Sequence, residues 1–157
     1  MMDQINKLFL DTGFSLLPPQ MDTAQARAML LAIGLQESRF QYRFQVRGPA
    51  RGFWQFESGG GVAGVINHRS TRYIIADACD SLVIPCTVSN CYQAIAYNDV
   101  LACVFARLLL WTLPFPLPEI GNREESWHQY IDAWRPGKPH RHTWDDLYQK
   151  VMNFIGG

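Results

Sequence analysis

The sequence has no net charge and lacks a long, uninterrupted apolar segment. Its 157 residues include 14 basic and 14 acidic side chains, so the basic excess typical of nucleic-acid-binding proteins is missing and we expect no nucleic-acid partner. The longest apolar stretch, residues 101–117, contains Arg107 and is interrupted by prolines from Pro114 onward, which argues against a membrane span. The first residues, MMDQINKLFLDTGF, carry two aspartates around a short apolar core and do not look like a secretory signal peptide.

The sequence also lacks the common metal-binding motifs. Its four cysteines are separated by six, four and eleven residues, so no CxxC pair is present; they are Cys79, Cys86, Cys91 and Cys103. None of the four histidines belongs to an HExxH motif. This spacing is atypical of a zinc site and favours buried free thiols, with one disulfide as the alternative. We therefore predict no metal site and no cofactor.

What is present is the length and composition of one globular domain. A chain of 157 residues with 48% hydrophobic residues can bury a substantial core. We predict a single domain over residues 1–157, in which residues 1–22 form an N-terminal lead-in segment. The stretch LLPPQMDT ends this segment in a turn, and Asp22 or Thr23 is well placed to cap the helix that follows.

The apolar pattern predicts a mainly α-helical fold. Residues 24–40 contain good helix formers and no proline, and residues 62–84 are also predicted to be mainly helical. Residues 90–111 are apolar almost all round, which predicts one buried central helix with Asn90 as its cap. Frequent glycine in the intervening chain predicts a small irregular or β-like loop region near residues 48–58.

Glu37 lies near the end of the helical run predicted over residues 24–40, four residues after Ile33. This spacing places its carboxyl group on the apolar face of the helix. Burial disfavours the charged form of a carboxyl group, so a glutamate in such a place can hold a proton near neutral pH. It can then donate that proton to a leaving oxygen, as the general acid does in glycoside cleavage. The alternative is a glutamate that extends to solvent or pairs with Arg39 or Arg43.

The loop after Glu37 has the composition of a carbohydrate-binding segment. It contains the run GFWQF at residues 52–56. Aromatic rings stack on sugar faces, and amide side chains and backbone groups bind hydroxyl and N-acetyl groups. The run therefore makes Phe53, Trp54 and Gln55 candidate substrate-binding residues, together with the backbone near Gly52. For the two aromatic side chains, burial in the core is the alternative.

The segments QESRF and GPARGFWQFE together resemble the signature of the lytic transglycosylase and goose-type lysozyme superfamily. In that family a helix ends on a catalytic Glu followed by Ser, and a loop of the form G-A-x-G-L-M-Q comes later. The matching residues here are Glu37, Ser38, Ala50, Gly52 and Gln55. Phe53 and Trp54 stand where the family has Leu and Met. The resemblance implies that Glu37 is the catalytic acid and that Ser38 belongs to the site.

A third family element, A-Y-N-A-G, places a tyrosine over the catalytic acid. The best match is AWRPGKP at residues 133–139, which makes Trp134 a further candidate site residue. The alternative match is AYND at residues 96–99, which continues into a predicted helix. An indole donates a hydrogen bond but cannot accept one as a phenol does. Trp134 is therefore a departure from the family pattern.

Glu57 is the nearest candidate for a second carboxylate. It follows Gln55 by two residues, which puts both on the same side of the chain if this stretch is extended. Inverting and retaining glycosidases use two carboxyl groups, whereas many members of the resembled superfamily work with a single Glu. A loop-edge acid without a catalytic role is the alternative for Glu57.

The resemblance covers about residues 23–140 and implies a lysozyme-like domain that acts on peptidoglycan glycan strands. The implied reaction is cleavage of the β-1,4 bond between N-acetylmuramic acid and N-acetylglucosamine, by a lytic transglycosylase or a muramidase without a cofactor. The compact ending and the missing signal peptide are similar to small phage-encoded members. This similarity implies a location in a phage virion or the host cytoplasm until delivery to the wall, with other virion proteins as further partners. A non-catalytic cell-wall-binding or structural virion protein with the same fold is the alternative.

Overall fold

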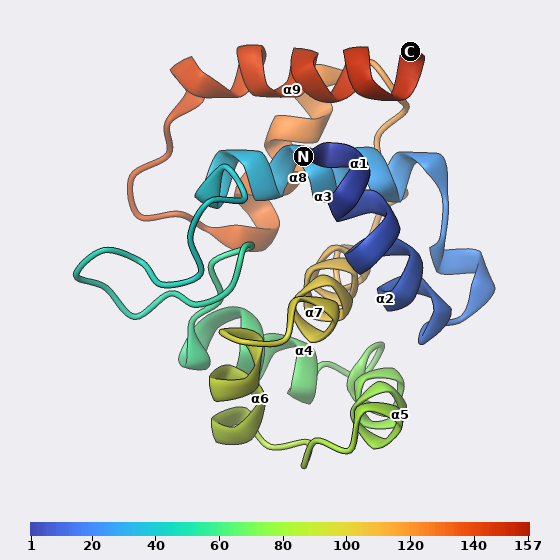
Figure 1. The fold of residues 1–157 in the computed structure, drawn as a ribbon, viewed down its shortest axis with the longest axis vertical. Coiled ribbons are helices and arrows are strands. Elements are labelled where there is room, and N and C mark those ends of the chain that lie inside the picture. The colour runs from blue at the N-terminus through green and yellow to red at the C-terminus, as the bar shows by residue number, and fades with distance from the viewer.

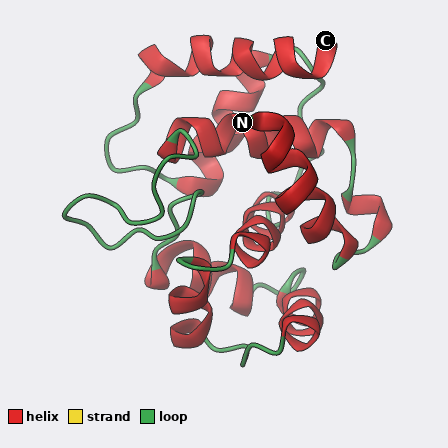
Figure 2. Ribbon diagram, viewed as in Figure 1, coloured by secondary structure: helices red, strands yellow, loops and turns green.

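Helices make up most of the molecule. The computed structural model describes all of residues 1–157 and consists of helices joined by loops, without a β-strand (Figure 2). The predicted mainly α-helical fold is therefore confirmed.

The N-terminal segment is a nearly continuous helix. α1 (Met2–Ile5) and α2 (Asp11–Ser15) are joined by a π-helical stretch, Asn6–Leu10. Gly13 allows this helix to approach the helix that contains Cys103 closely, because a Cβ at residue 13 would lie 2.9 Å from the sulfur of Cys103. The predicted lead-in segment thus packs into the core of the molecule.

α3 (Ala24–Ser38) is a largely buried helix, and its last turn contains Glu37. A short 3₁₀ helix, Pro19–Met21, precedes it, and the Thr23 hydroxyl caps it by accepting a hydrogen bond from a backbone N–H at 3.0 Å. Thr23 is therefore the cap, as one of the two predicted alternatives. Residues 28–35 are buried on every face of the helix. The helix ends at Arg39, whose left-handed conformation (φ 58°) redirects the chain.

Residues 39–57 form a long irregular loop, which extends away from the helices on one side of the molecule (Figure 1). Arg51 forms isolated antiparallel bridges with Phe44 and with Phe56. These bridges are the only β-like pairing in the chain, and they involve the region for which the sequence predicts irregular or β-like structure.

The segment after the loop contains short helices. A π-helical turn, Ser58–Val62, leads into α4 (Ala63–Asn67), and α5 (Arg72–Leu82) and α6 (Val88–Ile95) follow. These helices form the lower part of the molecule in Figure 1.

The prediction of one helix over residues 90–111 is wrong. The chain forms α6 and then α7 (Asp99–Trp111), which are bent by 118° relative to each other. The Asn98 side chain accepts a hydrogen bond from the backbone N–H of Leu101 at 3.0 Å and so starts a new helix. Thr87, rather than Asn90, caps α6.

Two C-terminal helices, α8 (Arg123–Trp134) and α9 (Arg141–Gly156), complete the fold. In Figure 1, α3, α8 and α9 form the upper part of the molecule, and α7 lies between this part and the lower helices. A single cluster of 38 buried apolar residues connects the N-terminal segment to α9. α7 supplies much of this cluster, and it also buries Arg107, whose Nε donates to the carbonyl of Met21 at 2.9 Å.

None of the helices is by itself long and apolar enough to cross a membrane. α6 and α7 reach that length and composition only when they are taken together, as a bent pair.

Candidate active site

Glu37 lies in the last turn of α3 and faces a tyrosine of α8. The hydroxyl of Tyr130 donates a hydrogen bond to Oε2 of Glu37. Glu37 is partly buried and Tyr130 is buried. On the other side, the Tyr42 hydroxyl donates to the backbone carbonyl of Glu37 at 2.9 Å. The carboxyl group therefore lies where α3, α8 and the loop 39–57 meet.

The surroundings of Glu37 favour its protonated form. Burial raises the pKa of this carboxyl group from 4.5 to about 7, although the Tyr130 hydrogen bond and the charge of Arg39 oppose the shift. The negative charge of Glu57 raises the pKa further. Burial and the nearby Glu37 also raise the pKa of Tyr130 above its ordinary value, so its hydroxyl remains a donor. Glu37 can hold a proton near neutral pH and still release it, as a general acid must.

Three hydrogen bonds hold Phe53 and Trp54 of the loop to α3 and α8. Ser38 Oγ donates to the carbonyl of Phe53 at 2.7 Å. The indole Nε1 of Trp54 donates to the carbonyl of Leu30 at 2.8 Å. The indole of Trp134 donates in turn to the carbonyl of Trp54, also at 2.8 Å. Because α3 and α8 form these hydrogen bonds with the adjacent residues Phe53 and Trp54, the loop has a fixed position relative to the end of α3.

An ion pair connects the same loop to α7. Arg43 donates to both carboxylate oxygens of Asp99, at 2.8 and 2.7 Å, and the Asp99 side chain is only 10% exposed. The guanidinium group also lies 4.2 Å from the centre of the Phe53 ring. Arg39 instead donates to backbone carbonyls of α3. Neither arginine forms a salt bridge with Glu37, which argues against the alternative of a simple surface ion pair.

The turn within GFWQF depends on Gly52. This residue has a left-handed conformation (φ +78°), and a Cβ there would lie 2.7 Å from Cγ2 of Ile95 on α6. Gln55 also has a positive φ (54°), and its Nε2 donates to the Gly52 carbonyl at 2.9 Å. Gln55 is partly exposed and Gly52 is buried. Of these two predicted substrate-binding residues, the structure therefore leaves only Gln55 open to a ligand.

A cleft of about 720 Å³ opens beside the loop. Its lining includes Glu57, glycines 59–61, Trp134 and Arg135. Glu57 is exposed. Trp134 lines this cleft, and its ring centroid lies 6.2 Å from that of Tyr130, but neither Tyr130 nor Glu37 is among the lining residues.

The structure corrects the predicted role of Phe53 and Trp54. Their side chains are only 5% and 0% exposed, and both rings pack edge-on against Phe40 at centroid distances of 5.5 Å. A ring without an exposed face cannot stack on a sugar. Core burial, the alternative interpretation, is the correct one for both side chains.

The predicted position of the third motif also needs correction. Sequence matching assigned the place over the acid to Trp134, whereas Tyr130 contacts Glu37 and Trp134 contacts the loop backbone. The sequence holds a signal that was missed. Tyr130 precedes Trp134 by four residues, and residues at that spacing share one face of a helix such as α8.

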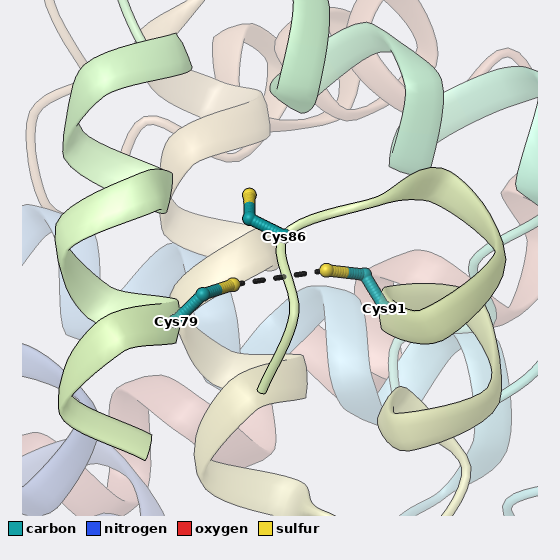
Figure 3. A group of neighbouring side chains, drawn as sticks. All are labelled: Cys79, Cys86 and Cys91. Carbon is teal, nitrogen blue, oxygen red and sulfur yellow. Dashed lines mark hydrogen bonds between the residues drawn. The ribbon is translucent and has the colours of Figure 1, made fainter. Parts of the chain in front are cut away.

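A second group of reactive side chains lies in the lower part of the molecule. The sulfur atoms of Cys79, Cys86 and Cys91 all lie within 4.8 Å of one another (Figure 3). The linear spacing of the cysteines did not predict this group. Cys103 lies elsewhere, against Gly13.

Comparisons with protein-family models, with curated proteins and with solved structures found no match. We therefore infer the function from the arrangement of the residues described above.

The raised pKa of Glu37 predicts a pH-dependent cost in stability. A carboxyl group whose pKa rises from 4.5 in the unfolded chain to about 7 on folding stabilises the folded state most at low pH. That contribution is lost as the pH rises from 4.5 to 7, and the difference amounts to about 3 kcal/mol above pH 7. Glu37→Gln stays neutral and can still accept the Tyr130 hydrogen bond.

We therefore expect Glu37→Gln to be increasingly more stable than the native protein as the pH rises through this window. Urea unfolding of both proteins at pH 5, 6, 7 and 8 measures the difference. A difference that is constant with pH would contradict the raised pKa. A difference that shrinks as the pH rises would show that Glu37 is stabilised as an anion.

Proposed function

We propose that the protein is a peptidoglycan-cleaving glycosidase with a lysozyme-like fold, a lytic transglycosylase or a muramidase. In this proposal the protein cleaves the β-1,4 bond between N-acetylmuramic acid and N-acetylglucosamine. The observation that carries this proposal is the carboxyl group of Glu37, which is partly buried, has a pKa of about 7 and accepts a hydrogen bond from Tyr130.

In the first step, protonated Glu37 donates its proton to the bridging oxygen. The bond between that oxygen and the anomeric carbon breaks, and positive charge develops on the sugar ring. The Tyr130 hydroxyl donates to the carboxylate that this step leaves behind. A donor in this position lowers the energy of the anion, and so it supports proton release from a carboxyl group that burial alone would keep protonated.

The second step determines the product. In the transglycosylase route, a hydroxyl group of the same sugar attacks the anomeric carbon and gives its proton to the Glu37 carboxylate, which yields an anhydro-sugar. In the hydrolase route, a water molecule attacks in its place. Glu57 lies at the edge of the cleft and is the candidate base for that water.

We place the extended glycan in the cleft beside the loop, with its scissile bond next to Glu37, which does not itself line the cleft. The cleft offers polar groups and a glycine-rich wall at residues 59–61, where a sugar chain can approach the backbone closely. Phe53 and Trp54 are buried, so we assign ring stacking to Tyr42, which is 41% exposed and hydrogen-bonds the Glu37 backbone. Gln55 supplies a partly exposed amide on the same loop. No residue around this site is assigned to a metal or a cofactor.

The competing function is a non-catalytic cell-wall-binding or structural virion protein. Such a protein would need an exposed binding surface, but it would have no use for a carboxyl group held protonated near neutral pH. The surroundings of Glu37 therefore favour an enzyme. In either case the proposed setting is a phage virion or the host cytoplasm before delivery, with the bacterial wall as the target and other virion proteins as partners.

Digestion of purified peptidoglycan sacculi tests the proposal. We expect the protein to release soluble muropeptides, which mass spectrometry identifies. Anhydro ends indicate a transglycosylase, and ends heavier by one water indicate a hydrolase. Binding to sacculi without release of muropeptides would instead support the non-catalytic function.

A further inference from the structure

Three cysteines from three consecutive segments meet in the lower part of the molecule. Cys79 lies on α5, Cys86 on the connecting loop and Cys91 on α6 (Figure 3). Figure 3 shows the side chains of Cys79 and Cys91 pointing toward each other, and their sulfur atoms are 3.7 Å apart. All three sulfurs lie within 4.8 Å of one another.

This separation fits a shared metal ion better than a disulfide. A tetrahedral ion with zinc–sulfur bonds of about 2.3 Å holds neighbouring sulfurs roughly 3.8 Å apart, close to the 3.7 Å between Cys79 and Cys91. A disulfide requires about 2.05 Å between the two sulfurs and involves only two of them. A disulfide between Cys79 and Cys91 would leave Cys86 without a role. In a metal site, Cys86 supplies the third sulfur ligand.

The backbone on either side of Cys86 is firmly held. Val83 is the left-handed residue that ends α5 (φ 57°), and the Ile84 N–H returns a hydrogen bond to the Cys79 carbonyl at 3.0 Å. On the other side, the Thr87 hydroxyl caps α6 by accepting a hydrogen bond from a backbone N–H at 3.1 Å. Valine rarely adopts a left-handed conformation. The hydrogen bonds on either side of Cys86 therefore hold the loop in a conformation that Val83 by itself disfavours. The three thiols are thereby placed before any ligand binds.

The cluster is sealed on one side and open on the other. Cys79 and Cys91 are fully buried, whereas Cys86 is partly exposed. No His, Asp or Glu side chain belongs to the group. A four-coordinate ion held here would therefore take its fourth ligand from solvent at the Cys86 side.

We propose that Cys79, Cys86 and Cys91 form a binding site for one thiophilic metal ion, and that this ion is Zn²⁺. The thiols lose their protons on binding, and the ion joins the end of α5, the loop and α6. Ile95 lies one turn after Cys91 on α6 and supports Gly52 of the site loop. The ion thus also stabilises the surface against which the loop 39–57 packs. This site is independent of the proposed glycosidase reaction.

The test is a metal titration of the purified full-length protein. Protein is prepared with a reductant, stripped with a chelator, and titrated with Zn²⁺ alone; bound metal is counted by elemental mass spectrometry after gel filtration. We expect one ion per chain. At free zinc about a hundredfold above Kd, we expect the melting temperature to rise by about 5–10 °C.

Two substitutions make the test specific. Cys86→Ala removes the partly exposed thiol with little loss of packing and is expected to reduce zinc binding at least tenfold. Cys103→Ala removes a cysteine outside the group and is expected to retain one ion per chain. Equal zinc binding by Cys86→Ala and the native protein would overturn the site, as would the absence of saturable binding to the native protein. A mass deficit of two hydrogens that maps to Cys79 and Cys91 in metal-free protein purified without reductant would instead identify a disulfide pair and overturn the proposal.

Discussion

Glu37→Gln is expected to lower the rate of peptidoglycan cleavage by about 10²- to 10⁴-fold while the fold is kept. Gln has nearly the same shape and can accept the Tyr130 hydrogen bond, but it has no proton to give to a leaving oxygen. The expected loss corresponds to roughly 3–5 kcal/mol in the activation barrier. The measurement is the initial rate of muropeptide release from sacculi, with circular dichroism and thermal unfolding to verify the fold.

The matched control for this variant is Glu57→Gln. Glu57 carries the same functional group, lines the cleft and is exposed, so its substitution removes a nearby charge without disturbing the core. We expect a loss of less than tenfold, because, of the two routes, we favour the one in which Glu37 alone acts first as acid and then as base. More than a few per cent of native activity in folded Glu37→Gln would rule out Glu37 as the proton donor. If Glu57→Gln is equally inactive, the enzyme uses two carboxyl groups and its products should carry hydrated ends.

The candidate acid could be predicted from sequence because its position depends on local rules. A capping residue, a run of helix formers and the spacing from Ile33 are sufficient to place Glu37 at the end of a largely buried helix. The loop that follows could also be recognised, since its glycines allow backbone conformations that other residues disfavour. Gly52, with φ +78°, is the clearest case.

The partner of the acid could not be predicted in the same way. Tyr130 is separated from Glu37 by 93 residues, and their contact depends on how α8 packs across the end of α3. Motif matching favoured Trp134 because it compares letters in order, whereas the structure selects the residue one helical turn earlier. The match between AWRPGKP and the family element A-Y-N-A-G therefore points to the end of α8, but to Trp134 instead of Tyr130.

Two other features depended on the tertiary fold. The apolar pattern runs through the junction of α6 and α7 without interruption, and only the hydrogen bond from Leu101 to the Asn98 side chain shows that the helix restarts there. The three-cysteine group forms because α5 and α6 are joined by a short reversing loop, which brings together thiols that are not close in sequence. Spacing rules for metal motifs apply to tight local knuckles and do not describe such an arrangement.

Gly34→Ala is expected to destabilise the protein by about 1–3 kcal/mol and to reduce activity more than tenfold. In an ordinary helix interior the same change would stabilise by up to about 1 kcal/mol, because alanine favours the helix more than glycine does. At Gly34 a Cβ would overlap the ring of Phe40. That ring packs against Phe53 and Trp54 at 5.5 Å, so moving it shifts the loop relative to Glu37.

Urea unfolding and the rate of muropeptide release measure the two effects of Gly34→Ala. Gly64→Ala is the control for stability, because Gly64 is a helical glycine around which a Cβ would meet no atom within 4 Å. We expect this control to be as stable as the native protein or slightly more stable. A similar result for Gly34→Ala would show that Phe40 can move aside without cost and would contradict the proposed coupling between α3 and the loop.

A double substitution identifies the cause of the Gly34→Ala defect. Phe40→Leu removes the distal ring atoms that a Cβ at residue 34 would meet, and on its own it should destabilise the protein through lost packing. In the double variant the added methyl group occupies part of the vacated space. The combined loss should therefore be smaller than the sum of the two single losses, by at least about 0.5 kcal/mol. Strict additivity would mean that the alanine acts through something other than the Phe40 ring, and the loop would then owe its position to its hydrogen bonds and to the Arg43–Asp99 ion pair.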